Sequence, residues 1–340
     1  MTIMTLNQVL QAFKIKASCI SASQHRHFSF YDLVLEPGAK ISKLNQCSKE
    51  IALALKSRSV PIVKMMPELG IVRLQLIHKQ ADLLPFDQLY RSSVKENGFL
   101  PFLLGETDEG NQLWVDMSKN PHLLVAGATG SGKSVFLHNM IANAAKYDDV
   151  KLYLVDTKKV EFGPYERPEF SDLIVNVAKD YTSAINLLDN LLKIMEMRYS
   201  HFDSIGCANI EQIPSGMNKI VVIIDEVADL MLMDKGGQFQ NSLVKLAAKS
   251  RAAGIYIILA TQRPSVDVLT GLIKANFPAR LACKVSSRVD SQIILDYQGA
   301  EHLAGRGDAI FKSPSNESVR LQIAHVNPQE TLDAVVARLD

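Results

Sequence analysis

The segment Gly127-Ala-Thr-Gly-Ser-Gly-Lys-Ser134 constrains the fold of this chain more than any other part of it. It directly follows an apolar run, 122–126, and opens a stretch whose apolar residues recur at helical spacing. It fits the P-loop pattern Gly-x-x-x-x-Gly-Lys-Ser, in which glycines let backbone N–H groups surround phosphate oxygens at the start of a helix. The chain is therefore predicted to contain an α/β domain in which a strand, this loop and a helix together bind a nucleotide.

The loop residues have predicted roles in holding ATP and Mg²⁺. Lys133 is expected to bridge the β- and γ-phosphates, and the hydroxyl of Ser134 is expected to be a ligand of Mg²⁺. The full set of predicted nucleotide-binding residues is Gly127, Ala128, Thr129, Gly130, Ser131, Gly132, Lys133, Ser134 and Asp225.

Polar side chains follow two further apolar runs, where α/β sheets place their ligands. Asp225 comes directly after the run 220–224 and is predicted to hold Mg²⁺ through water. Glu226 is predicted to polarise the attacking water, which makes this a site of hydrolysis. Gln262 follows the run 255–260 and is predicted to sense the γ-phosphate. The predicted metal ligands are thus Ser134 and Asp225, and Glu226 and Gln262 are catalytic candidates.

The pattern around these motifs predicts a mainly parallel sheet. Apolar runs alternate with helical patterns, which is typical of strands connected by crossover helices. Runs of consecutive apolar residues favour strands that are covered on both faces. The expected strands are 122–126, 151–155, 220–224, 255–260 and 280–285.

The N-terminal part of the chain has a different sequence pattern from the remainder. Residues 1–98 are predicted to form a small α+β subdomain with a connecting segment, and residues 99–340 the ATPase domain. The smaller part is expected to hold a helix with apolar residues from Leu6 to Phe13, a strand at 28–35, helical spacing from Leu44 to Leu55, and a strand pair at 60–66 and 71–77. A last helix is expected to begin at Asn327.

Composition and charge narrow the class of protein. The net charge is only +1, but eight basic residues and one acid lie between Lys245 and Arg288, which suits a phosphate-binding surface. The four cysteines are scattered without a Cys-x-x-Cys, which argues against zinc and against a disulfide framework. No apolar run approaches the roughly 20 residues that span a bilayer, and the N-terminus is unlike a signal peptide, so a cytoplasmic chain is expected.

Several long segments resemble the FtsK/SpoIIIE family of DNA translocases. The first is Pro121-His-Leu-Leu-Val-Ala-Gly-Ala-Thr-Gly-Ser-Gly-Lys-Ser134, and the longest is Ala260-Thr-Gln-Arg-Pro-Ser-Val-Asp-Val-Leu-Thr-Gly-Leu-Ile-Lys-Ala-Asn276. The others are Asp225-Glu-Val-Ala-Asp-Leu-Met231, Lys249-Ser-Arg-Ala-Ala-Gly-Ile255, Val285-Ser-Ser-Arg-Val-Asp-Ser291 and Gly305-Arg-Gly-Asp308. Leu35-Glu-Pro-Gly-Ala-Lys-Ile-Ser-Lys43 resembles the α subdomain of the same family. The resemblance covers nearly the whole chain.

The resemblance implies a RecA-like P-loop core that assembles into a hexameric ring on double-stranded DNA, with ATP between subunits. Arg280 lies at the position of the family's arginine finger and is expected to reach the neighbouring subunit's γ-phosphate. A finger supplied in trans makes hydrolysis depend on the ring. Lys274 and Arg288 are expected to face the pore and to contact DNA phosphates with little base readout.

Three departures from the family pattern refine this expectation. Neither a membrane segment nor a C-terminal winged-helix γ domain is recognised, and Asp290-Ser-Gln292 replaces the pattern Asp-Ser-Arg. These departures favour a motor of a plasmid, phage or mobile element, with a separate protein that recruits or anchors it. Two alternatives stay open: a conjugative coupling ATPase that moves single-stranded DNA, and a protein-secretion ATPase.

Overall fold

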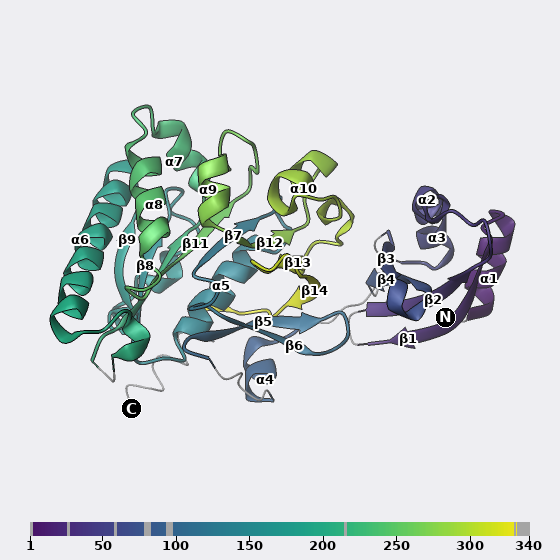
Figure 1. Cartoon of the computed structure of the whole chain (residues 1–340), viewed down its shortest axis with the longest axis horizontal. Helices are drawn as coiled ribbons and strands as arrows, with labels where there is room; N and C mark the ends of the chain where they lie inside the picture. The colour runs from purple at the N-terminus through teal and green to yellow at the C-terminus, as the bar shows by residue number, and fades with distance from the viewer. Residues whose placement is uncertain are drawn as a thin grey trace.

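The computed structural model describes residues 3–25, 28–57, 60–77, 83–92, 98–213, 216–329 and 331. In these residues the strands form a four-stranded sheet near the N-terminus and a ten-stranded sheet in the remainder of the chain. Figure 1 shows the two sheets in two units that lie end to end. The expected fold, a mainly parallel α/β core preceded by a small α+β part, is confirmed. The division at residue 98 stays a prediction.

The N-terminal sheet is antiparallel throughout, in the order β1-β2-β4-β3. Its strands are β1 Ala17–Gln24, β2 Phe28–Leu35, β3 Ile62–Met66 and β4 Ile71–Ile77, and its helices are α1 Ile3–Ala12, α2 Ile41–Gln46 and α3 Ser48–Ala54. The helices cover one face, where Leu10, Leu33 and Leu44 share a core. The helical spacing from Leu44 to Leu55 is realised as two short helices that meet at Cys47.

The ten-stranded sheet has the order β6-β5-β14-β13-β12-β7-β11-β10-β8-β9. The run from β12 to β9 is parallel, and the remaining strands pair antiparallel. The strands are β5 Pro101–Thr107, β6 Gln112–Asp116, β7 His122–Ala126, β8 Val150–Val155, β9 Ile174–Ala178, β10 Lys219–Ile224, β11 Ile255–Thr261, β12 Ala279–Cys283, β13 Asp308–Lys312 and β14 Ser318–Ile323. All five expected strands are present, with small differences at their ends, and the P-loop strand β7 lies inside the parallel run.

Helices cover both faces of the large sheet. Helix α5 (Lys133–Ala144) covers one face, and α6 (Tyr181–Ile205), α7 (Val227–Met233), α8 (Gln238–Lys249), α9 (Gly271–Asn276) and α10 (Arg288–Leu295) cover the other. Alternate residues of β10 enter the two cores, with Val222 in one and Val221 in the other. Burying each such side chain contributes roughly 1.5–3 kcal/mol, so this strand is anchored from both sides. Single 3₁₀ turns occur at Pro67–Leu69, Gly163–Tyr165, Pro168–Phe170, Ile210–Gln212 and Ala300–His302.

The segment before residue 98 joins the large sheet. Helix α4 (Phe86–Arg91) packs Phe86 and Leu89 against Leu103 of β5 and Val326. Just before α4, the backbone of residues 84–86 exchanges hydrogen bonds with that of His325. Of the helix expected from Asn327, residues 330 and 332–340 lie outside the described residues. None of the described helices has the length and apolar character needed to cross a bilayer.

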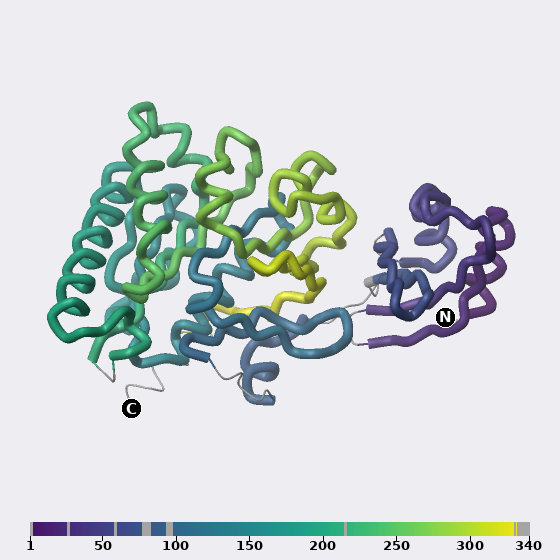
Figure 2. The backbone as a smooth tube through the Cα atoms, viewed as in Figure 1, coloured from purple at the N-terminus to yellow at the C-terminus, as the bar shows by residue number. Residues whose placement is uncertain are grey.

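The two units touch at one end of the large sheet. Phe28 and Phe30 of β2 pack against Ala304, and the guanidinium of Arg320 lies 5.1 Å from the ring centre of Phe28. Nearby, Gln75 Nε2 donates a hydrogen bond of 2.5 Å to Asp108 Oδ2. Figure 2 shows the N-terminal unit beyond the turn between β5 and β6, away from the helices α6 and α8.

Candidate active site

The P-loop begins at the carboxyl end of β7 and runs into α5. Gly127 N donates to the carbonyl of Thr261 at 3.2 Å, and Ala128 N donates to the carbonyl of Lys284 at 2.9 Å. Gly130 and Gly132 have φ angles of +73° and +114°, and a side chain on Gly132 would run into the backbone of Gly307. Glycine is required at Gly132 both by its backbone angle and by this close approach.

Lys133, the predicted phosphate-binding residue, and Asp225, the predicted metal-binding residue, are in contact. The Nζ of Lys133 donates to the backbone carbonyl of Asp225 at 2.9 Å and forms an ion pair with its carboxylate. Both side chains are buried. Burial raises the pKa of the Asp225 carboxyl, Lys133 opposes that shift, and the acids Glu161 and Asp156 add to it. The amine that is predicted to bind phosphate is therefore held by the acid that is predicted to hold the metal.

Glu226 is fixed by three neighbours at the carboxyl ends of adjacent strands. Its Oε1 accepts from Thr261 Oγ1 at 2.7 Å, and the backbone N of Gln262 donates to the same carboxylate at 3.1–3.2 Å. Its Oε2 lies 3.2 Å from Lys158 Nζ. Burial lowers the pKa of Lys158, but the carboxylates of Glu226 and Asp229 outweigh burial and raise it. Lys158 thus remains a cation beside Glu226.

Gln262 reaches the P-loop directly. Its side-chain oxygen accepts a hydrogen bond of 3.0 Å from Thr129 Oγ1. Since its backbone N also donates to Glu226, one residue bonds to both the phosphate-binding loop and the catalytic acid candidate. The structure thus brings four of the predicted groups together: the P-loop, Asp225, Glu226 and Gln262.

A cavity of about 330 Å³ opens over the P-loop, a volume suited to a small-molecule ligand. One part of its wall is the P-loop with Gln262. The other part is formed by Val135 of α5, by the segment before α4 with Leu83 and Leu84, and by strand β14 with nearby residues: Arg306, Gln322, Ile323 and His325. Its lining combines apolar side chains with a few polar groups, as is typical of a site for a nucleotide.

Arg280 is placed elsewhere. It lies on β12 and is buried, with Nη1 donating to the carbonyl of Ile294 at 2.9 Å and forming an ion pair with Asp296. Lys274 and Lys312 pair with the same carboxylate at 2.7 and 3.0 Å. Burial raises the pKa of the Asp296 carboxyl, but these three cations outweigh burial and hold that pKa far below its usual range. In the single chain Arg280 therefore does not line the cavity over the P-loop.

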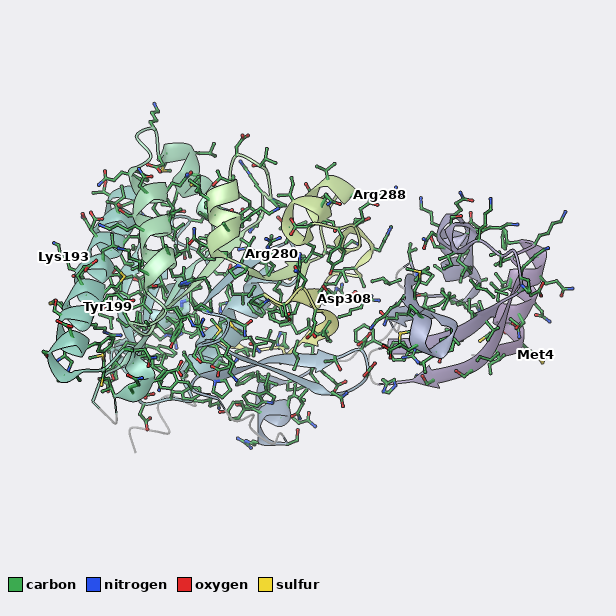
Figure 3. All side chains as sticks on the ribbon, viewed as in Figure 1. Met4, Lys193, Tyr199, Arg280, Arg288 and Asp308 are labelled. Atoms are coloured by element: carbon green, nitrogen blue, oxygen red, sulfur yellow. The ribbon has the colours of Figure 1, made fainter. Side chains whose placement is uncertain are left out.

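Lys274 and Arg288 border a second, open hollow of about 340 Å³ between α9 and α10. Lys274 is tied to Asp296, whereas the Arg288 side chain is 70% exposed and lies 3.9 Å from Glu301. Figure 3 shows Arg280 in the interior of the large unit and Arg288 at its outer edge. The two residues expected to contact DNA thus share one surface, with Arg288 the more accessible.

Sequence reasoning missed a group of polar residues after β8. Asp156, Lys158 and Glu161 follow this apolar strand just as Asp225 and Glu226 follow β10. Glu161 Oε2 accepts a hydrogen bond of 2.9 Å from Ser134, the predicted metal ligand. The same rule, polar residues at the carboxyl end of a parallel strand, could have identified them.

The donor set also fits a magnesium ion beside a nucleotide. Mg²⁺ prefers oxygen ligands and is usually bound by one or two protein groups together with phosphates and water. Ser134 and Asp225 offer a hydroxyl and a carboxylate, and no described residue donates to the buried Oδ1 of nearby Asp156. In the described part of the chain no cluster of three or more His, Cys, Asp and Glu ligands forms a separate metal site.

Comparison with solved structures supports the fold. TcpA, the conjugation coupling protein of pCW3, solved as a monomer with ATPγS, superposes with a TM-score of 0.70 at 21% identity, covering 99% of both chains. The cytoplasmic domain of the Type VII secretion ATPase EccC from Thermomonospora curvata has a TM-score of 0.60 at 23% identity, over 75% of this chain and 32% of its own. At these identities the likeness concerns the fold alone.

Sequence comparison identifies the family. The model of the FtsK alpha domain matches residues 1–76, and that of the FtsK/SpoIIIE family matches residues 88–219 and 215–266. DNA translocase FtsK of Treponema pallidum and DNA translocase SftA of Bacillus subtilis are each 36% identical over 98% of this chain, which spans 43% and 36% of their lengths. DNA translocase FtsK of Haemophilus influenzae is 35% identical, and 68% of its length is covered. The chain therefore belongs to the FtsK/SpoIIIE family.

Proposed function

We propose that this chain hydrolyses ATP to move along double-stranded DNA, as one subunit of a ring that is expected to be hexameric. The observation that carries the proposal is the ion pair of Lys133 with Asp225 beside a cavity that Lys133 and Gln262 line, with Gln262 bonded both to the P-loop and to Glu226. The relatives that match nearly the whole chain are named DNA translocases, which supports DNA as the polymer along which this chain moves.

In the proposed site, the P-loop amides hold the phosphates and Lys133 leaves Asp225 for the β- and γ-phosphate oxygens. Ser134 and Asp225 would hold Mg²⁺, which would neutralise charge that develops on the phosphates. Glu226, held by Thr261 and Lys158, accepts a hydrogen bond from the attacking water and orients it. The fixed carboxylate needs little reorganisation during the reaction.

The cavity beside the P-loop is proposed to take the nucleoside. Leu84 and Ile323 offer apolar surface to a purine ring, and the side chains of Gln322 and His325 offer polar contacts. Because the backbone of residues 84–86 is bonded to His325, this wall is formed jointly by the segment before α4 and the chain after β14.

Arg280 is proposed to complete the site of the next subunit. It lies outside its own cavity and among an excess of cations, so a phosphate from a neighbouring site would be an attractive partner. Lys274 and Arg288 are proposed to meet DNA phosphates, and a cytoplasmic plasmid, phage or mobile-element motor, recruited by a separate protein, is the proposed setting.

A duplex translocation assay tests the proposal. The purified chain is incubated with ATP, Mg²⁺ and a long duplex that carries a labelled third strand at a distal site, and release of that strand is followed. Release with ATP, and none with Lys133→Ala, is the expected result. The same protein is assayed for ATP hydrolysis with duplex, single-stranded DNA or no DNA. Stimulation by single strands alone would favour a coupling ATPase, and hydrolysis indifferent to DNA would favour a secretion ATPase.

A further inference from the structure

A chain of hydrogen bonds extends from the predicted metal ligand into the protein. Ser134 Oγ donates to Glu161 Oε2 at 2.9 Å, and Glu161 Oε1 lies 3.1 Å from His138 Nε2. The other ring nitrogen of His138 lies 2.9 Å from the hydroxyl of Tyr165. The side chains of His138 and Glu161 are 13% and 16% exposed, so the chain of hydrogen bonds is partly shielded from water.

The position of Glu161 is fixed independently of Ser134. Asp156 Oδ2 accepts hydrogen bonds from the backbone N of Glu161 at 2.8 Å and of Phe162 at 3.0 Å. Phe162 and Tyr165 are fully buried in the core under α5. Ser134 and His138 are four residues apart on α5, so both face Glu161 from one side of the helix. The carboxylate is therefore held by the loop after β8 as well as by the helix.

A hydroxyl that binds a cation does so through an oxygen lone pair, and its proton must point away from the cation. An acceptor on the far side of the hydroxyl fixes that orientation and makes the oxygen a better ligand. Glu161 is such an acceptor for Ser134, and His138 holds the other Glu161 oxygen.

We propose that Glu161 is a positioning residue in the binding of Mg²⁺. Glu161 orients the hydroxyl of Ser134 and is itself oriented by His138 and Tyr165. The inference rests on the proposed function only in assuming that Ser134 binds Mg²⁺ beside a nucleotide. It does not depend on DNA or on the ring. The role assigned is separate from holding the P-loop in shape, because it is exerted only when Mg²⁺ is bound.

The test measures binding of a fluorescent ADP analogue to the purified chain while Mg²⁺ is titrated, with a parallel series in EDTA. Glu161→Met removes the acceptor at similar side-chain length, and Glu161→Gln retains an oxygen that Ser134 can donate to. We expect Glu161→Met to raise the Mg²⁺ concentration at half-saturation about tenfold or more. Glu161→Gln should recover most of that loss, and affinity in EDTA should be unchanged for both.

A double-mutant cycle separates this role from a structural one. If Glu161 acts through the Ser134 hydroxyl, Glu161→Met should have little further effect on the Mg²⁺ midpoint in a Ser134→Ala background. Equal losses with Mg²⁺ and in EDTA, or an unchanged Mg²⁺ midpoint in Glu161→Met, would overturn the proposal. Should Glu161→Met fail to fold, Glu161→Gln and His138→Phe decide, with the larger midpoint shift expected for His138→Phe. Failure of the wild type to bind nucleotide would instead contradict the proposed function.

Discussion

Two charged centres of the large sheet differ in the sign of their excess charge. An acidic centre lies at the carboxyl ends of β7, β8 and β10 and consists of Lys133, Asp156, Lys158, Glu161, Asp225 and Glu226. A basic centre lies where β12 and β13 meet the end of α10 and consists of Lys274, Arg280, Asp296 and Lys312. The first has twice as many acids as cations, and the second has one acid for three cations.

The pKa shifts of the two aspartates reflect that difference. Burial raises the pKa of Asp225, and its acidic neighbours add to the shift although Lys133 opposes it. Burial acts on Asp296 in the same direction, but three cations reverse it and lower the pKa. The acidic centre would therefore attract a further cation, and the basic centre a further anion. Mg²⁺ would be that cation, and a phosphate of a neighbouring subunit's nucleotide would be that anion.

The largest expected effect is that of Arg280→Ala. If this side chain is an arginine finger, pure assemblies of the variant should hydrolyse ATP roughly 10³-fold more slowly or worse, because the transition-state charge loses its partner. ATP affinity should change little. Steady-state hydrolysis and equilibrium nucleotide binding on the same preparation measure both.

Asp296→Asn is the matched control, since it weakens the same contact and leaves the guanidinium in place. Hydrolysis within a few-fold of wild type is expected for it. An equal loss of ATP hydrolysis in both variants would mean that Arg280 acts by holding the end of α10. The basic centre would then have no part in catalysis.

Glu226→Gln tests the acidic centre and is expected to lower turnover about 100-fold or more, because the amide cannot take up the proton of water. ATP binding should persist, since Lys133 and the P-loop are untouched. Single-turnover hydrolysis is compared with filter binding of ATP. A variant that retains wild-type turnover would show that Glu226 serves only to anchor Thr261 and Lys158.

The pH dependence of stability tests the burial of strand β7, which leads to the acidic centre. Burial lowers the pKa of His122, the first residue of β7, to about 4 from 6.5. Between these values the unfolded chain binds the proton and the folded chain does not, so the free energy of unfolding falls as the pH is lowered. This residue should reduce it by about 2 kcal/mol at pH 5 relative to pH 8. Urea unfolding of wild type and His122→Leu measures the difference, and equal pH dependence in both would refute it.

The smallest effect is expected for the DNA contacts. Arg288→Ala and Lys274→Ala should each weaken duplex binding a few-fold and reduce the salt slope by about 1, whatever the DNA sequence. Arg288 should matter more, because its side chain is 70% exposed, whereas Lys274 is held in an ion pair with Asp296. Lys193→Ala, on the exposed side of α6, is the control. Unchanged salt slopes in both variants would place the DNA surface elsewhere.

Much of the fold followed from local pattern. The apolar run of β10 is buried on both faces, and its two cores are filled by alternate residues, which is why consecutive apolar residues predicted it. Strand β1 was not predicted, because Ala17–Gln24 mixes small polar and apolar residues, is mostly exposed and is held by pairing with β2. The antiparallel strands β5 and β6 were missed as well; β5 begins at a proline, and Gly105 interrupts its apolar run.

The acidic centre was partly predictable and the basic centre was not. Asp225 and Glu226 directly follow their strand, so the edge of the sheet locates them. Glu161 comes several residues after β8 and reaches Ser134 only because Asp156 folds the loop back. The contact between Arg280 and Asp296 depends on the left-handed backbone at Asp296, where φ is 68°, and on the packing of α10 against β12. No sequence spacing encodes such a contact.

Mixing two inactive variants tests most directly whether the two centres form one site across subunits. Lys133→Ala and Arg280→Ala are each expected to be inactive alone. In an equal, random mixture, about one interface in four joins an intact P-loop to an intact Arg280, so hydrolysis should reappear at up to about a quarter of the wild-type rate. A mixture that forms shared assemblies on duplex DNA and remains as inactive as either variant at every ratio would contradict the account.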